Sequence, residues 1–154
     1  MKQRLPSFDF CFCCGEKNSF GLNIPFFAVE NGVQAVFTPA GRHAGYPGIM
    51  HGGLTATVLD EAMTWAATIG TGRFHYAADI NVRYKAPVPH GEEITVTAAI
   101  VETIKKIIVV DGEIRDSNNK VLAKSVGKYY PLPESDDLTI KSMMRHYDNG
   151  YSLS

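Results

Sequence analysis

The residues best suited to chemistry in this sequence lie between His51 and Glu61, in the stretch HGGLTATVLDE. His51, Gly52 and Gly53 stand directly before a run without glycine or proline, which favours a helix. The first backbone N–H groups of a helix have no partner inside it and carry partial positive charge. Because glycines leave these groups unobstructed, they can stabilise an oxyanion that develops on a carbonyl under attack. A Gly-Gly pair at the start of a helix is as often an ordinary turn as an oxyanion site, so these three residues alone are weak evidence for catalysis.

Asp60 and Glu61 carry the only formal charges between His51 and Thr71. The rest of this stretch is apolar or small on most faces, and a helix of that kind is buried on most sides. A buried carboxylate is costly unless it is paired or hydrogen-bonded. Asp60 shares its helical face with small side chains that leave room for a ligand, namely Ala56, Thr57, Thr64 and Ala67. The alternative is that the two acids mark the single solvent-exposed edge of a surface helix.

The spacing between these groups constrains how they can act together. Asp60 lies nine residues after His51, which is about 13 Å along a helix axis at the usual rise per residue. One helix therefore cannot present both its N-terminus and its own Asp60 to the same carbonyl. If both groups act together, they must come from two subunits whose helices lie antiparallel, side by side. This predicts a homodimer with two sites across the interface.

The elements expected before the helix are two strands and a loop. Residues 22–29 and 33–38 are predicted to pair as a hairpin through Asn31-Gly32, a strong turn sequence. Residues 39–53 are expected to form a glycine-rich loop. Residues 54–69 then predict a helix of about four turns that ends at Gly70 and Gly72.

Four further strands are expected after the helix, at residues 78–86, 93–103, 106–116 and 121–130. In the first of them apolar and polar residues alternate, which predicts one buried face made of Ala78, Ile80, Val82 and Tyr84. Two strands, one helix and four strands indicate an α+β fold in which an antiparallel sheet wraps around a single helix, the hotdog fold.

The whole chain is expected to be one domain, residues 1–154, because its length fits one sizeable core. We expect an irregular N-terminal segment at residues 1–20, a core at 21–131 and a tail at 132–154. A short docked helix in the tail would use its large apolar side chains, Leu138, Met143, Met144 and Tyr147.

Composition argues against several functional classes. The formal net charge of −1 gives no global attraction for nucleic acid or an anionic membrane, so neither is expected as a partner. The N-terminal residues lack the apolar run of a signal peptide, and the uncharged stretch at residues 44–59 is too short to span a bilayer. A cytoplasmic location is therefore expected.

The three cysteines, Cys11, Cys13 and Cys14, lie close together near the N-terminus. Near-adjacent cysteines bridge one another poorly, and the odd count fits a reducing compartment. Without a second distant pair they do not supply a four-ligand zinc site, so no metal is expected. Nothing in the local sequence predicts an activated thiolate, and packed core thiols are the preferred interpretation.

Several spaced motifs together resemble one protein family. Residues 45–53, GYPGIMHGG, followed by Leu59-Asp60-Glu61-Ala62, are similar to the phenylacetate-degradation-type branch of the hotdog thioesterases. Residues 81–87, NVRYKAP, resemble the next strand of that family. Residues 11–15, CFCCG, with residues 18–22 resemble the opening of several members, although Ser19 replaces the usual proline. The resemblance covers about residues 8–131.

The resemblance implies a dimeric or tetrameric enzyme that hydrolyses acyl-CoA or aryl-CoA thioesters, with no cofactor beyond the CoA of the substrate. It further implies that the N–H group of Gly53, with Gly52 as a second donor, polarises the thioester carbonyl. Asp60 of the partner subunit would be the nucleophile or the general base. His51 would shape the carbonyl site or serve only to start the helix.

This sequence departs from the family at two positions. Some relatives carry an asparagine where this chain has Gly45, and many carry a serine or threonine where it has Ala77. The groups near enough in the sequence to replace these helpers are His75, Tyr76 and Asp79. The departures leave open a non-catalytic acyl-CoA-binding or sensing protein. A hotdog dehydratase or hydratase is a further alternative, although an aspartate nine residues after the histidine favours hydrolysis.

Substrate contacts are predicted at seven positions, Met50, Glu61, Trp65, His75, Tyr76, Ala77 and Arg83. Leu54 and Phe74 are further candidates for an acyl tunnel, although core packing explains the apolar members of both sets equally well. Basic residues suited to the nucleotide phosphates include Arg42, Arg73, Arg83, Lys85, Lys105, Lys106 and Lys128. Such residues on an antiparallel sheet usually form its solvated face.

Overall fold

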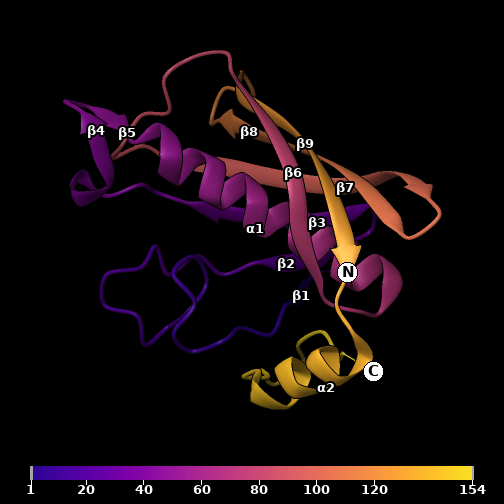
Figure 1. Ribbon diagram of the computed structural model, residues 1–154. Helices are drawn as coiled ribbons and strands as arrows, with labels where there is room; N and C mark the ends of the chain where they lie inside the picture. The colour runs from indigo at the N-terminus through magenta and orange to yellow at the C-terminus, as the bar shows by residue number, and fades with distance from the viewer. Residues whose placement is uncertain (1, 154) are drawn as a thin grey trace.

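The computed structural model describes residues 2–153, so the outermost residues of the predicted domain, 1 and 154, lie outside it. The chain folds into a seven-stranded antiparallel sheet that wraps around one long helix (Figure 1). Across the sheet the strands are β1 (Gln3–Arg4), β2 (Phe27–Val29), β3 (Gly32–Phe37), β7 (Ile94–Ile104), β8 (Ile107–Asp116), β9 (Val121–Pro131) and β6 (His75–Tyr84). The predicted α+β hotdog fold is confirmed.

The central helix, α1 (Gly52–Thr71), is longer at both ends than predicted. It starts at Gly52 because His51 caps it, and it runs through Gly70. Gly72 ends it with a φ of 73°, a left-handed conformation that glycine adopts at little cost. At Gly112 of β8 a Cβ atom would lie 3.1 Å from Cγ of Met63, so this glycine allows close packing of the sheet on the helix.

The strands after the helix match their predicted bounds to within three residues, whereas the first predicted strand is much shorter. Only Phe27–Val29 pairs in the sheet. The N–H groups of Leu22 and Ile24 instead donate to the carbonyls of Phe12 and Cys13, and Asn23 has a φ of 56°. These residues therefore hold the N-terminal segment rather than extend the sheet.

The predicted loop at residues 39–53 contains regular structure. A 3-10 helix, η1 (Gly41–His43), leads into a small antiparallel ribbon of β4 (Ala44–Tyr46) and β5 (Ile49–Met50). The N–H of His51 donates to the carbonyl of His43, so the ribbon is tied to the start of α1.

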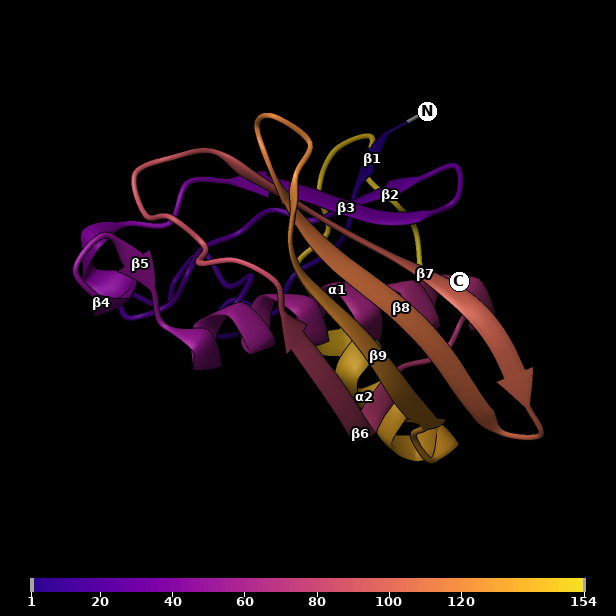
Figure 2. The same cartoon turned by 90° about the horizontal axis from the view of Figure 1, so that it is seen from above.

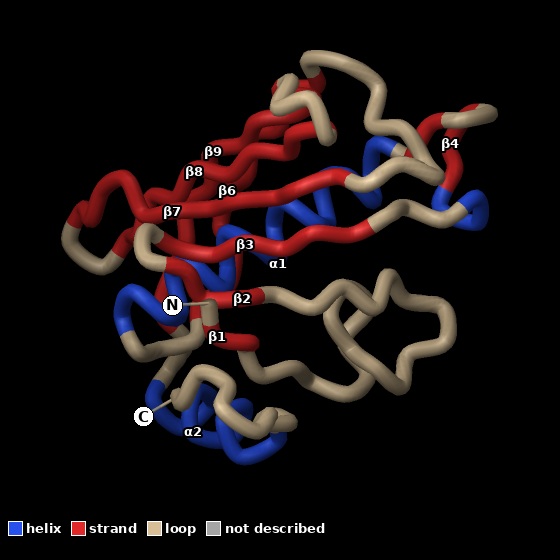
Figure 3. Tube along the Cα trace, turned by 180° about the vertical axis from the view of Figure 1, so that it is seen from behind, coloured by secondary structure: helices blue, strands red, loops and turns tan. Residues whose placement is uncertain are grey.

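The tail contains the predicted docked helix, α2 (Glu134–Met143), and the predicted contact residues are confirmed in part. Met144 packs against the core, and the Tyr147 hydroxyl lies 2.7 Å from the Ser7 hydroxyl oxygen. Leu138 and Met143 are 59% and 58% exposed. The buried carboxylate of Asp137 instead accepts the Phe74 N–H at 2.7 Å. The irregular N-terminal segment and α2 lie on the same side of the domain, below α1 in Figures 1 and 3.

The predicted buried face of the strand after the helix is wrong for a single subunit. β6 lies at the free edge of the sheet, as Figure 2 shows, and Ala78, Ile80 and Tyr84 are exposed. Ile80, Val82 and Tyr84 do point to the helix side, because they pair with residues of β9 that include the buried Ala123 and Ser125. The sequence pattern thus identified the correct face for these three residues, whereas a β-bulge between Ala77 and Asp79 interrupts the alternation at Ala78.

None of the helices in residues 2–153 combines the length and apolar character needed to cross a membrane.

Candidate active site

The start of α1 differs in one respect from the arrangement expected. His51 is the N-cap residue, and its Nδ1 accepts the N–H of Gly53 at 2.9 Å. The N–H groups of Leu54 and Thr55 donate to the His51 carbonyl. Within residues 2–153 the N–H of Gly52 has no hydrogen-bond partner. Gly52 therefore offers the open donor, whereas the N–H of Gly53 is already bonded.

A cavity of about 660 Å³ adjoins this open donor, between the β4–β5 ribbon and the end of β6. Its wall includes Met50, Gly52, Tyr84 and Lys85. The Tyr84 hydroxyl donates to the Gly52 carbonyl at 2.7 Å, which ties the end of β6 to the start of the helix. Lys85 is exposed and belongs to the wall of the same cavity.

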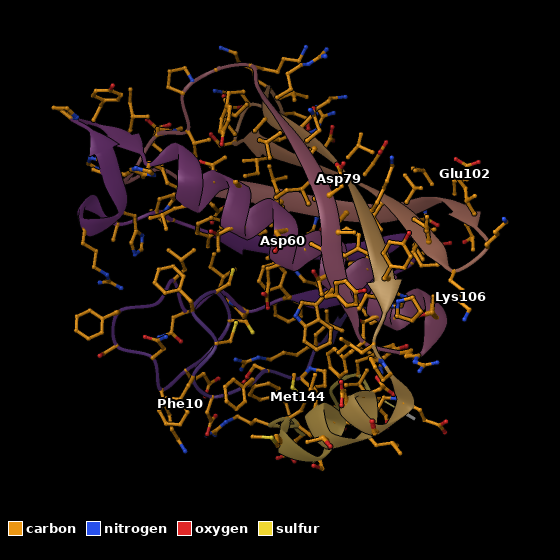
Figure 4. All side chains as sticks on the ribbon, in the orientation of Figure 1. Phe10, Asp60, Asp79, Glu102, Lys106 and Met144 are labelled. Carbon is orange, nitrogen blue, oxygen red and sulfur yellow. The ribbon has the colours of Figure 1, made fainter. Side chains whose placement is uncertain are left out.

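Asp60 lies in the middle of α1, next to β6 (Figure 4). Its Oδ1 accepts the hydroxyl of Tyr129 on β9 at 2.8 Å. Burial raises the pKa of the Asp60 carboxyl, and the Tyr129 hydrogen bond lowers it in part. Asp60 is only partly exposed, which argues against the alternative that it lies on the solvent-exposed edge of a surface helix.

Sequence reasoning missed Tyr129. Its register partner on β6 is Ala77, the position where many relatives carry a hydroxyl side chain, so the phenol reaches Asp60 from the neighbouring strand. A Cβ atom at Gly127 would lie 2.5 Å from Cε2 of Tyr129, so this glycine makes room for the ring. The alternation of small buried residues along β9, ending in a buried tyrosine, was the available clue.

Gly45 stands at the other position where relatives differ. A Cβ atom there would lie 3.0 Å from Cα and 3.2 Å from Cδ2 of His51. An asparagine would therefore press on the side chain that now caps the helix.

Two of the predicted substrate-binding residues point elsewhere. The Trp65 indole N–H donates to Oε1 of Glu61 at 3.1 Å, and the Cys11 thiol lies 3.7 Å from the same oxygen. Burial raises the pKa of Glu61 to about 7. Trp65 also packs edge-on against Phe74, with ring centroids 5.6 Å apart. These contacts are separate from the Asp60–Tyr129 pair.

The predicted residues on β6 do not contact Asp60 within the described chain. His75 is buried, with its Nδ1 2.7 Å from the Arg73 carbonyl, and burial lowers its pKa. Tyr76 stacks on Tyr130 at the surface. Arg83 and Asp79 are exposed on this edge strand. Within one subunit, none of these side chains replaces the missing helpers.

The cysteine cluster is partly as expected. Cys13 and Cys14 are buried, and burial raises the pKa of the Cys13 thiol. A hydrogen bond from the Cys14 side chain lowers the pKa of Cys11 to about 6. This contact depends on the folded turn and is not visible in the local sequence.

Comparison with known proteins places this geometry in a family. A profile of the thioesterase superfamily matches residues 47–123, half of the chain, and this region contains Gly52, Asp60 and Ala77. Acyl-coenzyme A thioesterase 13 of Mus musculus is 32% identical over 88 residues, which cover 56% of this chain and 61% of that protein. The match therefore spans about three fifths of that relative's length.

Solved structures share the fold. The PaaI protein of E. coli, from the phenylacetic acid degradation operon, superposes with a TM-score of 0.67 at 23% identity, over 73% of this chain and 81% of that one. The protein smu.793 of Streptococcus mutans UA159, solved with acetyl CoA, gives a TM-score of 0.65 at 20% identity, over 71% and 89%. Family profile, fold and spaced motifs agree: the chain belongs to the thioesterase superfamily.

Proposed function

We propose that this protein hydrolyses acyl-CoA or aryl-CoA thioesters to the free acid and CoA. The observation that carries the proposal is the half-buried Asp60 carboxylate, held by Tyr129 on a helix whose first N–H is open. A relative is named an acyl-coenzyme A thioesterase, and a protein of the same fold binds acetyl CoA, which supports a CoA thioester as the substrate.

In the proposed reaction the N–H of Gly52 donates to the thioester carbonyl and stabilises its oxyanion as the carbon is attacked. Asp60 acts as the general base that takes a proton from water, or attacks directly and forms an anhydride that water then cleaves. Either route consumes one water and releases a carboxylic acid and the CoA thiol. Because Tyr129 binds Oδ1, the second carboxylate oxygen is left for the water or the substrate.

The two groups are proposed to come from different subunits. Gly52 and Asp60 lie eight residues apart on one helix, about 12 Å along its axis. The free edge of β6 and its exposed apolar side chains, which include Ile80 and Tyr84, offer a surface on which a second copy can pair. Antiparallel association would bring Gly52 of one chain toward Asp60 of the other.

The activity is tested by measuring CoA release with chromatography over a panel of short, long, branched and aryl thioesters. Chromatography is preferable to a thiol reagent, because the chain itself has three free cysteines. We expect one CoA released per thioester consumed. Binding by calorimetry with no CoA released from any member of the panel would instead support the acyl-CoA-binding alternative.

Changing Tyr129 to phenylalanine is expected to lower kcat/KM by about tenfold to a hundredfold, the usual effect of losing a hydrogen bond to a charged group. This hydrogen bond lowers the Asp60 pKa, so its loss lets Asp60 keep its proton to higher pH. The acid limb of the kcat/KM profile should therefore move to higher pH. Tyr130→Phe is the matched control, because Tyr130 stacks on Tyr76 and should leave the limb in place. An unmoved limb in Tyr129→Phe would contradict this role.

Changing Ile80 to lysine is expected to weaken dimerisation by at least about tenfold, because a charge would enter an apolar interface. Light scattering coupled to gel filtration should then show a monomer with lost activity. Leu138→Lys is the control, since Leu138 is also an exposed apolar residue but lies on α2. A dimer that survives Ile80→Lys, or that dissociates equally in both variants, would rule out the β6 interface.

A further inference from the structure

Three side chains suited to metal binding meet where the N-terminal segment packs on α1. One ligand atom each of Cys11, Cys14 and Glu61 lies within 4.8 Å of the others. Sγ of Cys11 is 3.7 Å and 3.8 Å from the two carboxylate oxygens of Glu61. A tetrahedral zinc ion with ordinary bond lengths to sulfur and oxygen separates such donors by about 3.5 Å. The cluster is therefore close to the size that zinc requires.

The turn that carries the two thiols is built so that both point to the same place. The N–H of Cys14 donates to Sγ of Cys11 at 3.4 Å, and the N–H of Gly15 donates to the Cys11 carbonyl at 3.0 Å. A Cβ atom at Gly15 would lie 2.5 Å from the carbonyl oxygens of Asp9 and Cys11, so only glycine fits. An N–H donated to sulfur favours the thiolate, which is the form that binds metals.

Glu61 is the part of the cluster that the catalytic proposal leaves unexplained. Its hydrogen-bond partners are the Trp65 indole and the two thiols, and it forms no ion pair within residues 2–153. A buried carboxylate is costly unless it takes up a proton or binds a cation. A divalent ion would supply the missing positive charge.

We propose that Cys11, Cys14 and Glu61 bind one Zn²⁺ ion, with a fourth position open to the adjoining apolar cavity. Thiolate and carboxylate ligands together favour zinc over magnesium or calcium, and three protein ligands with one open position is an established zinc arrangement. The cavity is about 480 Å³, and its wall includes all three ligands together with Phe8, Trp65 and Phe74. Cysteine spacing alone had argued against a metal, because the third ligand lies 50 residues from Cys11 in the chain.

A zinc ion here would fasten the N-terminal segment to α1 one residue beyond Asp60. It lies on the Glu61 side of the helix, apart from the Asp60–Tyr129 pair. Metal binding can therefore be measured without substrate, and its outcome is independent of whether the protein hydrolyses thioesters.

The test is metal analysis of the protein purified without chelator, followed by titration of the reduced, metal-free chain with Zn²⁺ and with Co²⁺. We expect one ion per chain and a cobalt spectrum with thiolate charge-transfer bands. Cys11→Ser and Cys14→Ser should each weaken Zn²⁺ binding by about a hundredfold or more, and Glu61→Gln by about tenfold. Cys13→Ser is the matched control and should bind as the unchanged chain does.

Alkylation of the unchanged chain keeps the test decisive if a variant fails to fold. Zn²⁺ should protect Cys11 and Cys14 from iodoacetamide and leave the reactivity of Cys13 unaltered, as read by peptide mass spectrometry. No binding by the reduced chain, equal loss of binding in Cys13→Ser, or a Cys11–Cys14 disulfide in place of a metal would overturn the proposal.

Discussion

Replacing Asp60 with asparagine is expected to lower kcat for acyl-CoA hydrolysis by about a thousandfold. The asparagine side chain has nearly the same shape, and its oxygen can still accept the Tyr129 hydroxyl that now lies 2.8 Å from Oδ1. It cannot take a proton from water or attack a carbonyl. The loss should therefore appear in kcat, measured as CoA release at saturating substrate, while the proposed dimer and the affinity for thioesters stay intact.

The same variant is expected to be more stable than the unchanged protein at neutral pH. Burial raises the pKa of Asp60 in the folded state, so the folded chain holds this proton more tightly than the unfolded chain does. As the pH rises from the pKa of Asp60 in the unfolded chain to its higher pKa in the folded chain, ionisation of Asp60 lowers the free energy of unfolding. Asparagine removes this cost. Scanning calorimetry should show a higher Tm for Asp60→Asn at neutral pH, and a smaller difference in mild acid.

Asp111→Asn is the control for both measurements, because Asp111 is an exposed acid on β8. It should change neither the rate nor the Tm. A normal rate in Asp60→Asn would move the catalysis to another residue. A rate loss together with a lower Tm would mean that Asp60 is structural.

The sheet and the helix could be predicted because their patterns are local. Alternation of period two marked β6, β-rich composition marked β7, β8 and β9, and the run without glycine or proline marked α1. The exposure of Ile80 and Tyr84 could not be predicted in the same way. Alternation shows which side chains share a face, but not whether the same chain or a second copy covers that face.

The candidate site was predictable only where its chemistry is contained in one helix. Asp60 followed from residue type within α1, whereas Gly53 was expected as the main donor and Gly52 only as a second one. Tyr129 lies 69 residues after Asp60, so its hydrogen bond depends on the register between β9 and β6. The bond from Gly53 to His51 depends on a side-chain rotamer, which no residue pattern specifies.

Changing Gly52 to proline is expected to lower kcat by about a hundredfold to a thousandfold, because proline removes the one open N–H at the start of α1. The fold should tolerate it. Gly52 is the first helical position, where proline is favoured, and the preceding His51 has a ψ of 132° that suits a residue before proline. A Cβ atom there meets only the Tyr84 ring, at 3.6 Å. Gly52→Ala fills the same space but keeps the N–H, so it should lose far less activity.

Mixing the two inactive variants tests whether the site crosses the interface. A heterodimer of Asp60→Asn and Gly52→Pro chains contains one site in which the first chain supplies an intact Gly52 N–H and the second an intact Asp60. Purified through two different tags, it should recover about half of the normal activity per dimer, because one of two symmetric sites is complete. If both groups acted within one chain, no site in the heterodimer would be complete and the activity would stay near zero. Since Gly52 and Asp60 are fixed at opposite ends of more than two helical turns, only the first result is compatible with their acting on one carbonyl.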